Sequence, residues 1–147
     1  MNRRQLLQAL AVLPLGVTLS AQAALPPVQV YKSAGCGCCE EWIKHLQVNG
    51  FSVQAQDVPD TGVYRQRFGI PQELGSCHTA RVAGYALEGH VPAADIKRLL
   101  KEKPQAAGLA VPSMPLGSPG MEGPRKDPYD VFLVGKKGER SVYRHYP

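Results

Sequence analysis

Three of the four cysteines, Cys36, Cys38 and Cys39, lie within four residues, between a predicted strand and a predicted helix. Residues 28–31 alternate in polarity as a strand does, and residues 40–48 carry apolar side chains at helical spacing. A second alternating segment follows at 51–58. A strand, a helix and a strand in about 30 residues predict a βαβ unit with parallel strands. The cysteine loop (residues 33–39) is therefore expected where the first helix begins.

The rest of the chain extends this unit. The pattern predicts a helix at 63–68, a hairpin at 79–90 that turns at Ala83-Gly84, an amphipathic helix at 92–103 and a second hairpin at 129–146. A βαβ unit followed by a helix, antiparallel strands and a further helix is the order of elements in thioredoxin-like domains. We therefore predict an α/β fold, a single thioredoxin-like domain with a mixed sheet flanked by helices.

The N-terminal residues predict export. A basic pair (Arg3-Arg4), an apolar stretch (6–19) and a small-x-small cleavage site (21–23) indicate a secretory signal peptide over residues 1–23. The arginine pair suits either a twin-arginine or a general secretory signal. We expect a mature domain of residues 24–147 in the periplasm, with no membrane span.

The charge pattern argues against nucleic-acid binding. The formal net charge is +5, and two of the positive charges, Arg3 and Arg4, belong to the predicted signal peptide. No basic cluster or basic-aromatic stripe stands out in the remainder. Phosphate contacts need a concentrated positive face, so we expect no nucleic-acid partner.

The cysteine loop allows three kinds of chemistry. Free backbone N–H groups at a helix N-terminus favour thiolates, which are soft metal ligands and redox nucleophiles. Cys36 and Cys39 have the C-x-x-C spacing of dithiol oxidoreductases, whereas Cys36 and Cys38 form a C-x-C clamp for a soft ion. Structural disulfides are the third reading, but a bridge within the loop closes too few residues to add much stability. Disulfide exchange needs only two cysteines, so the third cysteine of the loop favours a metal site.

The fourth cysteine is expected to meet this loop in space. Cys77 precedes the predicted third strand, and in a thioredoxin-like fold that turn packs beside the redox loop. The neighbouring His78 is a candidate ligand, a hydrogen-bond donor to a ligand, or a surface residue. We expect His45 to be solvated, and His90 and His145 to be structural or exposed.

A long Pro/Gly-rich loop at 106–128 contains the two methionines of the mature chain, Met114 and Met121. Such a long irregular segment in a compact domain usually has a function or is disordered. Thioethers are soft ligands that suit Cu(I), so the methionines favour copper over zinc. Zinc sites more often show ligands in two spaced pairs, which this chain lacks.

Four motifs, taken in this order, resemble those of a known family: YKSAGCGCCEEW at 31–42, SCHTA at 76–80, EGHVPA at 88–93, and GLAVP at 108–112 running into MP at 114–115 and GSPGME at 117–122. The family is that of the CopG-like proteins, small exported bacterial proteins linked to copper resistance and long filed as a domain of unknown function. The resemblance implies a thioredoxin-like fold and copper bound through Cys36, Cys38, Cys39 and Cys77.

From the residues and the resemblance together we predict a periplasmic copper-binding protein. It would bind one or several Cu(I) ions through the four cysteines, with Met114, Met121 and His78 as further candidate ligands. Cys36 and Cys39 are the redox candidates for interconverting Cu(I) and Cu(II). A thiol–disulfide oxidoreductase acting on proteins and a passive copper metallochaperone remain alternatives, so whether the protein is an enzyme stays open. Its partners would be copper ions and other periplasmic copper-handling proteins.

Overall fold

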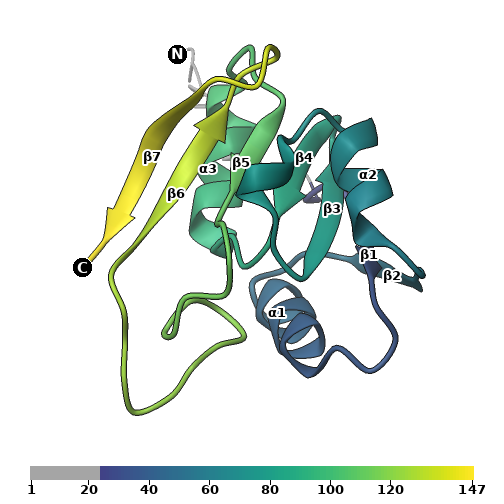
Figure 1. Cartoon of the computed structure of the whole chain (residues 1–147), viewed down its shortest axis with the longest axis vertical. Coiled ribbons are helices and arrows are strands. Elements are labelled where there is room, and N and C mark those ends of the chain that lie inside the picture. Colours follow the sequence, from purple (N-terminus) through teal and green to yellow (C-terminus); the bar gives the residue numbers. More distant parts are fainter. Residues whose placement is uncertain (1–23) are drawn as a thin grey trace, which may run out of the picture.

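The computed structural model describes residues 24–147, so the predicted signal peptide lies outside the described residues. The helices and strands follow in this order: β1 (Val28–Lys32), α1 (Gly37–Val48), β2 (Val53–Asp57), α2 (Thr61–Arg67), η1 (Gln72–Leu74), β3 (His78–Val82), β4 (Tyr85–Glu88), α3 (Ala93–Glu102), β5 (Gly108–Ala110), β6 (Tyr129–Val134) and β7 (Arg140–Tyr146) (Figure 1). Among the described residues, no helix combines the length and the apolar character needed to span a bilayer.

The seven strands form one mixed sheet in the order β2-β1-β3-β4-β5-β6-β7. Strands β1 and β2 are parallel and joined through α1, which confirms the predicted βαβ unit. Strand β3 is antiparallel to β1, and β4 is antiparallel to β3. The succession β1-α1-β2-α2-β3-β4-α3 is thioredoxin-like, as predicted, and β5, β6 and β7 widen the sheet beyond it.

The strands bury different residues on the two faces of the sheet. On one face, Val28 and Val30 of β1 pack in the main core with apolar residues of α1 and α3, among them Trp42, Leu46, Ile96 and Leu99. On the other face, the ring of Tyr31 stacks on Tyr64 of α2 at 3.9 Å between centroids. Because side chains alternate along a strand, neighbouring residues of β1 reach different layers.

The hairpins form as predicted. Strands β3 and β4 are joined at Ala83 and Gly84, whose φ values of 46° and 89° suit a tight two-residue hairpin turn. Strands β6 and β7 pair in an antiparallel manner and form the predicted second hairpin. Helix α1 begins at Gly37, three residues before the predicted start, because the cysteines themselves form its first turn.

The predicted irregular loop at 106–128 begins with a strand, β5. This short strand pairs in parallel with β4, and all three of its residues are buried. A side chain at Gly108 would collide with the carbonyl of Ala86, so this close approach requires glycine. Three residues are too few for a periodic signal, which explains why the sequence pattern did not reveal the strand.

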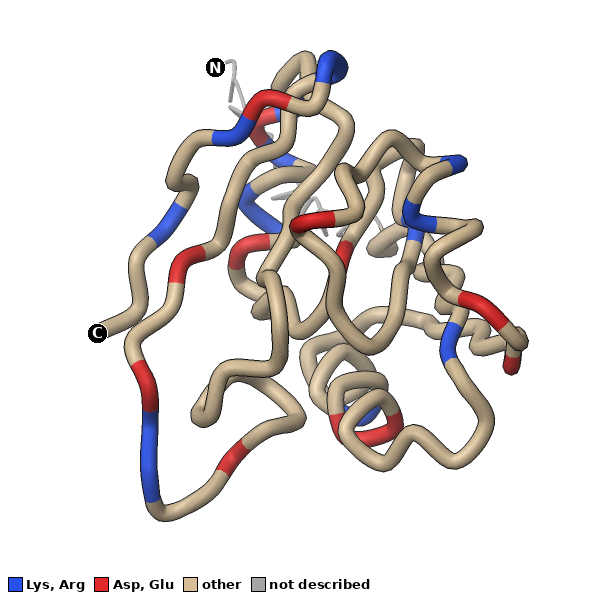
Figure 2. Tube along the Cα trace, in the orientation of Figure 1, with Lys and Arg blue, Asp and Glu red and all other residues tan. Residues whose placement is uncertain are grey.

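The remainder of this segment runs beside α1 before it reaches β6 (Figure 1). Gly120 has a φ of +90°, and a Cβ there would lie 2.7 Å from the Cys38 carbonyl oxygen and 2.8 Å from the Trp42 nitrogen. The segment from Val111 to Met121 carries no charged residue and is continuously tan in Figure 2. An uncharged loop therefore packs directly on the first turns of the cysteine-bearing helix.

Candidate metal centre

The cysteine loop occupies the position predicted for it, at the N-terminus of α1. Cys36 is the residue that precedes the helix, and Cys38 and Cys39 lie in its first turn. Gly35 has a φ of 71°, a left-handed conformation that favours glycine and turns the chain into the helix. The free N–H groups and the positive end of the helix dipole therefore lie beside the cysteine loop.

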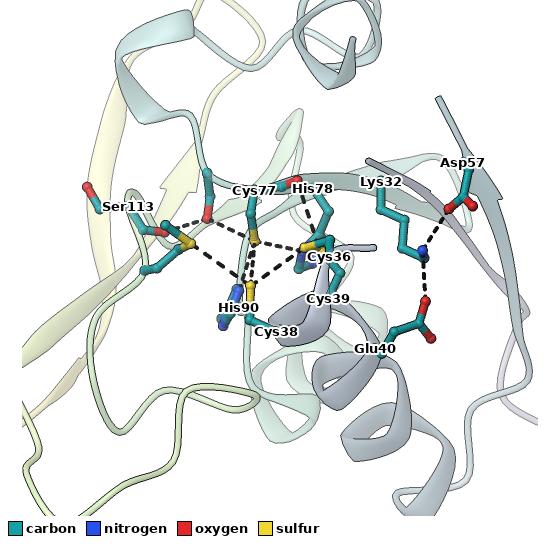
Figure 3. The surroundings of a disulfide bond; sticks show 12 residues. Lys32, Cys36, Cys38, Cys39, Glu40, Asp57, Cys77, His78, His90 and Ser113 are labelled. Atoms are coloured by element: carbon teal, nitrogen blue, oxygen red, sulfur yellow. Dashed lines mark hydrogen bonds and ion pairs between the residues drawn. A yellow bond between two sulfur atoms is a disulfide. The ribbon is translucent and has the colours of Figure 1, made fainter. Parts of the chain in front are cut away.

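Two of the four cysteines are joined. Cys36 and Cys39 form a disulfide, while Cys38 and Cys77 are free thiols (Figure 3). Cys39 is fully buried, whereas Cys36 is partly exposed. The structure thus uses the C-x-x-C pair for the disulfide and leaves the thiol between them outside it.

The sheet brings Cys77 to the loop. In the antiparallel pairing of β1 and β3, Lys32 lies opposite His78, so Cys77 lies opposite the start of the cysteine loop. The sulfur of Cys38 is 3.7 Å from that of Cys77 and 3.6 Å from that of Cys36. All four sulfurs lie within 4.8 Å of one another. The predicted meeting of Cys77 with the loop is therefore present in the fold.

The environment of Cys77 opposes ionisation in the absence of metal. Burial, followed by the proximity of Cys38, raises the pKa of the Cys77 thiol to about 12. A soft cation reverses this preference, because a metal ion displaces the thiol proton when it binds.

Two buried histidines also contact Cys77. The Nδ1 atom of His78 lies 3.3 Å from the sulfur, and the Nε2 atom of His90 lies 3.0 Å from it. Both side chains are fully buried, and the His78 ring packs on Trp42 with centroids 4.3 Å apart. Burial lowers the pKa of His78 to about 3 and also lowers the pKa of His90. Both imidazoles are therefore neutral near neutral pH, which is the form that binds metals.

The proximity of His90 to the sulfurs was missed at the sequence level. The residue follows β4, and the amide of Gly89 donates a hydrogen bond to the His78 carbonyl at 3.0 Å, which closes the far end of the β3–β4 hairpin. We call residues 76–78 together with 89–90 the hairpin end. The signal that points to His90 is the hairpin register itself, since Thr79 pairs with Glu88 and places both histidines at the same end.

The other two histidines lie elsewhere. His45 was predicted to be solvated, but it is half-buried, and its Nε2 accepts a hydrogen bond from the Ala93 amide at 3.0 Å. This amide is one of the free donors at the start of α3, and its need for a partner explains the difference. His145 is exposed, as expected, and pairs with Asp130 at 2.7 Å.

The two methionines differ in position. The Sδ atom of Met114 lies 4.0 Å from the Cys38 sulfur, and the side chain is 47% exposed. Met121 closes a turn of its loop through backbone bonds, accepting from Gly117 and donating to Ser118. Within the described residues its sulfur makes no hydrogen bond to a cysteine. Only Met114 therefore extends the sulfur cluster directly.

A buried ion pair holds the backbone of the hairpin end. The Oε1 atom of Glu88 accepts from the Ser76 amide at 2.7 Å and from the Arg65 Nε at 2.9 Å, while the Arg65 Nη2 donates to the Ser76 carbonyl at 3.0 Å. Burial raises the pKa of Glu88, opposed by its hydrogen bonds. The Ser76 hydroxyl donates to the Ser113 carbonyl, and the Ser113 amide donates to Gly75. This network fixes Cys77 and ties it to the segment that carries Met114.

A charged group lies on the opposite side of the loop. Lys32, at the end of β1, is only 5% exposed and pairs with Glu40 and Asp57, each at 2.7 Å (Figure 3). These two hydrogen bonds raise the pKa of Lys32. The lysine is thus held charged and anchors the first turn of α1 to the strand ends.

The donor set suits a soft metal ion. It offers four cysteine sulfurs, a thioether next to Cys38 and two neutral imidazole nitrogens next to Cys77. Thiolate and thioether ligands select Cu(I), and bridging thiolates hold more than one ion. With Cys36 and Cys39 in a disulfide, two of the four sulfurs are withdrawn, so the full set requires the dithiol form.

Comparisons with known proteins agree with this chemistry. A family profile described as "Protein of unknown function, DUF411" matches residues 74–121. No curated protein matches the chain. Two solved structures, described as "Copper resistance protein copG- Form 2" and "Form 1", are each 47% identical to it, with TM-scores of 0.79. Each match covers 84% of this chain, and 99% and 98% of the respective solved chains. The chain therefore belongs to the CopG family of copper resistance proteins.

Proposed function

We propose that this chain is a periplasmic copper-binding protein of copper resistance, which holds Cu(I) through Cys36, Cys38, Cys39 and Cys77 and interconverts Cu(I) and Cu(II) by thiol redox chemistry. The observation that carries the proposal is that the four sulfurs lie within 4.8 Å of one another. Four sulfurs so close together can bridge several Cu(I) ions. Met114 adds a thioether at the exposed side of this cluster.

The redox step uses the dithiol of Cys36 and Cys39. The two thiols first release two protons and become thiolates. Two Cu(II) ions then take one electron each from these thiolates, which join as the disulfide, and the two ions become Cu(I). In the reverse direction, the disulfide accepts two electrons from two Cu(I) ions and yields two thiolates and two Cu(II) ions. Cys38 and Cys77 remain available to hold copper in both states, because neither belongs to the disulfide.

The location and partners follow from other features. Export rests on the basic pair, apolar stretch and cleavage site in residues 1–23, which leave residues 24–147 as the mature domain. A role in copper resistance rests on the two solved relatives, which are both described as copper resistance proteins. The partners we propose are copper ions and other periplasmic copper-handling proteins.

Cu(I) titration of the reduced mature domain tests the metal assignment. Under anaerobic conditions and against a competing chelator, we expect more than one Cu(I) per chain, and we expect the Cys36→Ser, Cys38→Ser double variant to lose this capacity. Ser33→Ala is the matched control, since it changes the same loop without removing a sulfur. Less than one ion per chain, or undiminished binding by the double variant, contradicts the proposal.

A protein thiol–disulfide oxidoreductase is the second candidate. The partly exposed first cysteine and the buried second cysteine of the C-x-x-C pair favour it, because an attacking thiol needs access and a resolving thiol does not. In that case Cys39→Ser traps mixed disulfides with proteins at Cys36, and the native domain reduces insulin. If neither assay shows activity, this candidate is excluded, and the proposed copper function is unaffected.

A further inference from the structure

Cys77 belongs to two groups of possible ligands. One is the set of four sulfurs already described, and the other combines Cys77 with His78 and His90, whose ligand atoms also lie within 4.8 Å of one another. The first set contains both cysteines of the disulfide. The second contains neither, so it is complete in the disulfide form that the structure shows.

The two buried histidines converge on the Cys77 sulfur. The Nδ1 atom of His78 and the Nε2 atom of His90 both approach the same sulfur, at 3.3 and 3.0 Å. A single thiol proton satisfies only one ring nitrogen lone pair. The other two ring nitrogens, Nε2 of His78 and Nδ1 of His90, are buried, and no group among the described residues meets full hydrogen-bond geometry with them. The backbone of Gly89 and that of Pro119 interact with the His78 and His90 imidazoles, respectively, and oppose the lowering of their pKa values. A cation between the three atoms would use both lone pairs and the thiolate at once.

The distances suit a shared ion. A sulfur at about 2.3 Å and a nitrogen at about 2.0 Å from one metal, at a tetrahedral angle, lie about 3.5 Å apart. The two sulfur–nitrogen distances in the structure are within about half an ångström of this value, so only a small movement opens the site. One cysteine with two histidines is a set that binds copper in the Cu(II) state, whereas a set of thiolates alone favours Cu(I).

We propose that Cys77, His78 and His90 form a second, mononuclear site that holds one Cu(II) ion while Cys36 and Cys39 are in the disulfide. The assignment rests on the proposed copper function and adds to it a separate binding site for Cu(II). With Cys36 and Cys39 already in the disulfide, this pair has no electrons to give, so a Cu(II) ion that arrives is bound at the hairpin end and is not reduced by the pair. Binding there displaces the thiol proton of Cys77 and involves no change of oxidation state.

The test uses the mature domain in its disulfide form with the Cys38→Ser substitution. This variant keeps the three proposed ligands and removes the thiol 3.7 Å from Cys77, so Cu(II) cannot drive a Cys38–Cys77 disulfide. On titration with Cu(II) alone, we expect one ion per chain with thiolate-to-copper charge transfer. The electron paramagnetic resonance spectrum should show coupling to two imidazole nitrogens. Fewer than two coupled nitrogens, or no stoichiometric binding, overturns the proposal without any histidine variant.

Histidine variants give the second readout. In the same background we expect His90→Gln to weaken Cu(II) binding by at least about 100-fold, since losing a residue that merely orients a ligand already costs about 10–100-fold. His145→Gln is the control and should bind as the parent does, because His145 is exposed and pairs with Asp130. Equal affinity in His90→Gln and the parent contradicts the proposal. Cu(I) loading of the reduced wild-type domain, measured in parallel, reports separately on the cluster, so the two failures are distinguishable.

Discussion

The two parts of the candidate site are built in opposite ways. The cysteine loop offers three thiols from one short stretch, and the two glycines within it, Gly35 and Gly37, have open space where a Cβ would stand. The hairpin end offers one thiol and two imidazoles from the two strand ends of a hairpin, with Cys77 and His90 separated by 13 positions in the sequence. Its histidines are fully buried, and the Arg65–Glu88 pair holds its backbone.

This difference divides the chemistry between the two parts. A loop with space around it can rearrange between a disulfide and two thiolates, which is what redox exchange demands. A buried and hydrogen-bonded segment keeps its ligand atoms in place while the loop changes. We infer that the cysteine loop is the redox-active half of the site and the hairpin end its fixed half, and the following predictions test that division.

The largest effect is expected from Glu88→Ala. Removing the carboxylate leaves Arg65 buried without its partner and the Ser76 amide without its acceptor, which should destabilise the domain by about 3–5 kcal/mol. The matched control is Glu41→Ala, which breaks the exposed pair with Lys44 and should leave the stability of the domain nearly unchanged. Urea unfolding measures both values, and similar losses in the two variants would show that the hairpin end is not specially anchored.

The next effect concerns pH in the metal-free protein. The pKa of His78 is lowered to about 3 from an ordinary value of 6.5, so between these values the unfolded chain binds a proton that the folded chain excludes. The contribution of His78 to the free energy of unfolding is therefore fully present above pH 6.5. Below this pH it is lost, by about 1.4 kcal/mol per pH unit. Unfolding free energies at pH 7, 6 and 5 should decline in this order, and less steeply in His78→Gln. An unfolding free energy that does not change between pH 7 and pH 5 would show that the His78 imidazole is exposed to solvent and not buried.

A smaller effect is expected in the loop that covers α1. Gly120→Ala puts a Cβ against the helix backbone at a φ of +90° and should cost about 1–3 kcal/mol. Gly123→Ala meets nothing within 4 Å and should stay within about 0.5 kcal/mol of the parent. Thermal unfolding compares the two. If Gly120→Ala unfolds like the control, the loop does not pack on the cysteine-bearing helix, and the proximity of Met114 to Cys38 loses its support.

The same contrast explains what the sequence could predict. The cysteine loop was placed correctly because strand, thiols and helix are contiguous, and the thioredoxin order then placed Cys77 opposite it. Strand β5 escaped prediction because three residues carry no period. The predicted turn at Ala83-Gly84 already fixes a register that brings His90 near Cys77, but His90 escaped because no local pattern reports that its side chain is buried there. The disulfide partners were also open, since C-x-C and C-x-x-C overlap in the same four residues.

X-ray absorption at the copper edge is the most direct test of the central claim that four sulfurs form one copper centre. On the reduced domain loaded with Cu(I), the account predicts a first shell of sulfur ligands together with a short copper–copper scattering path. A first shell dominated by nitrogen or oxygen, with no copper–copper path, would contradict it.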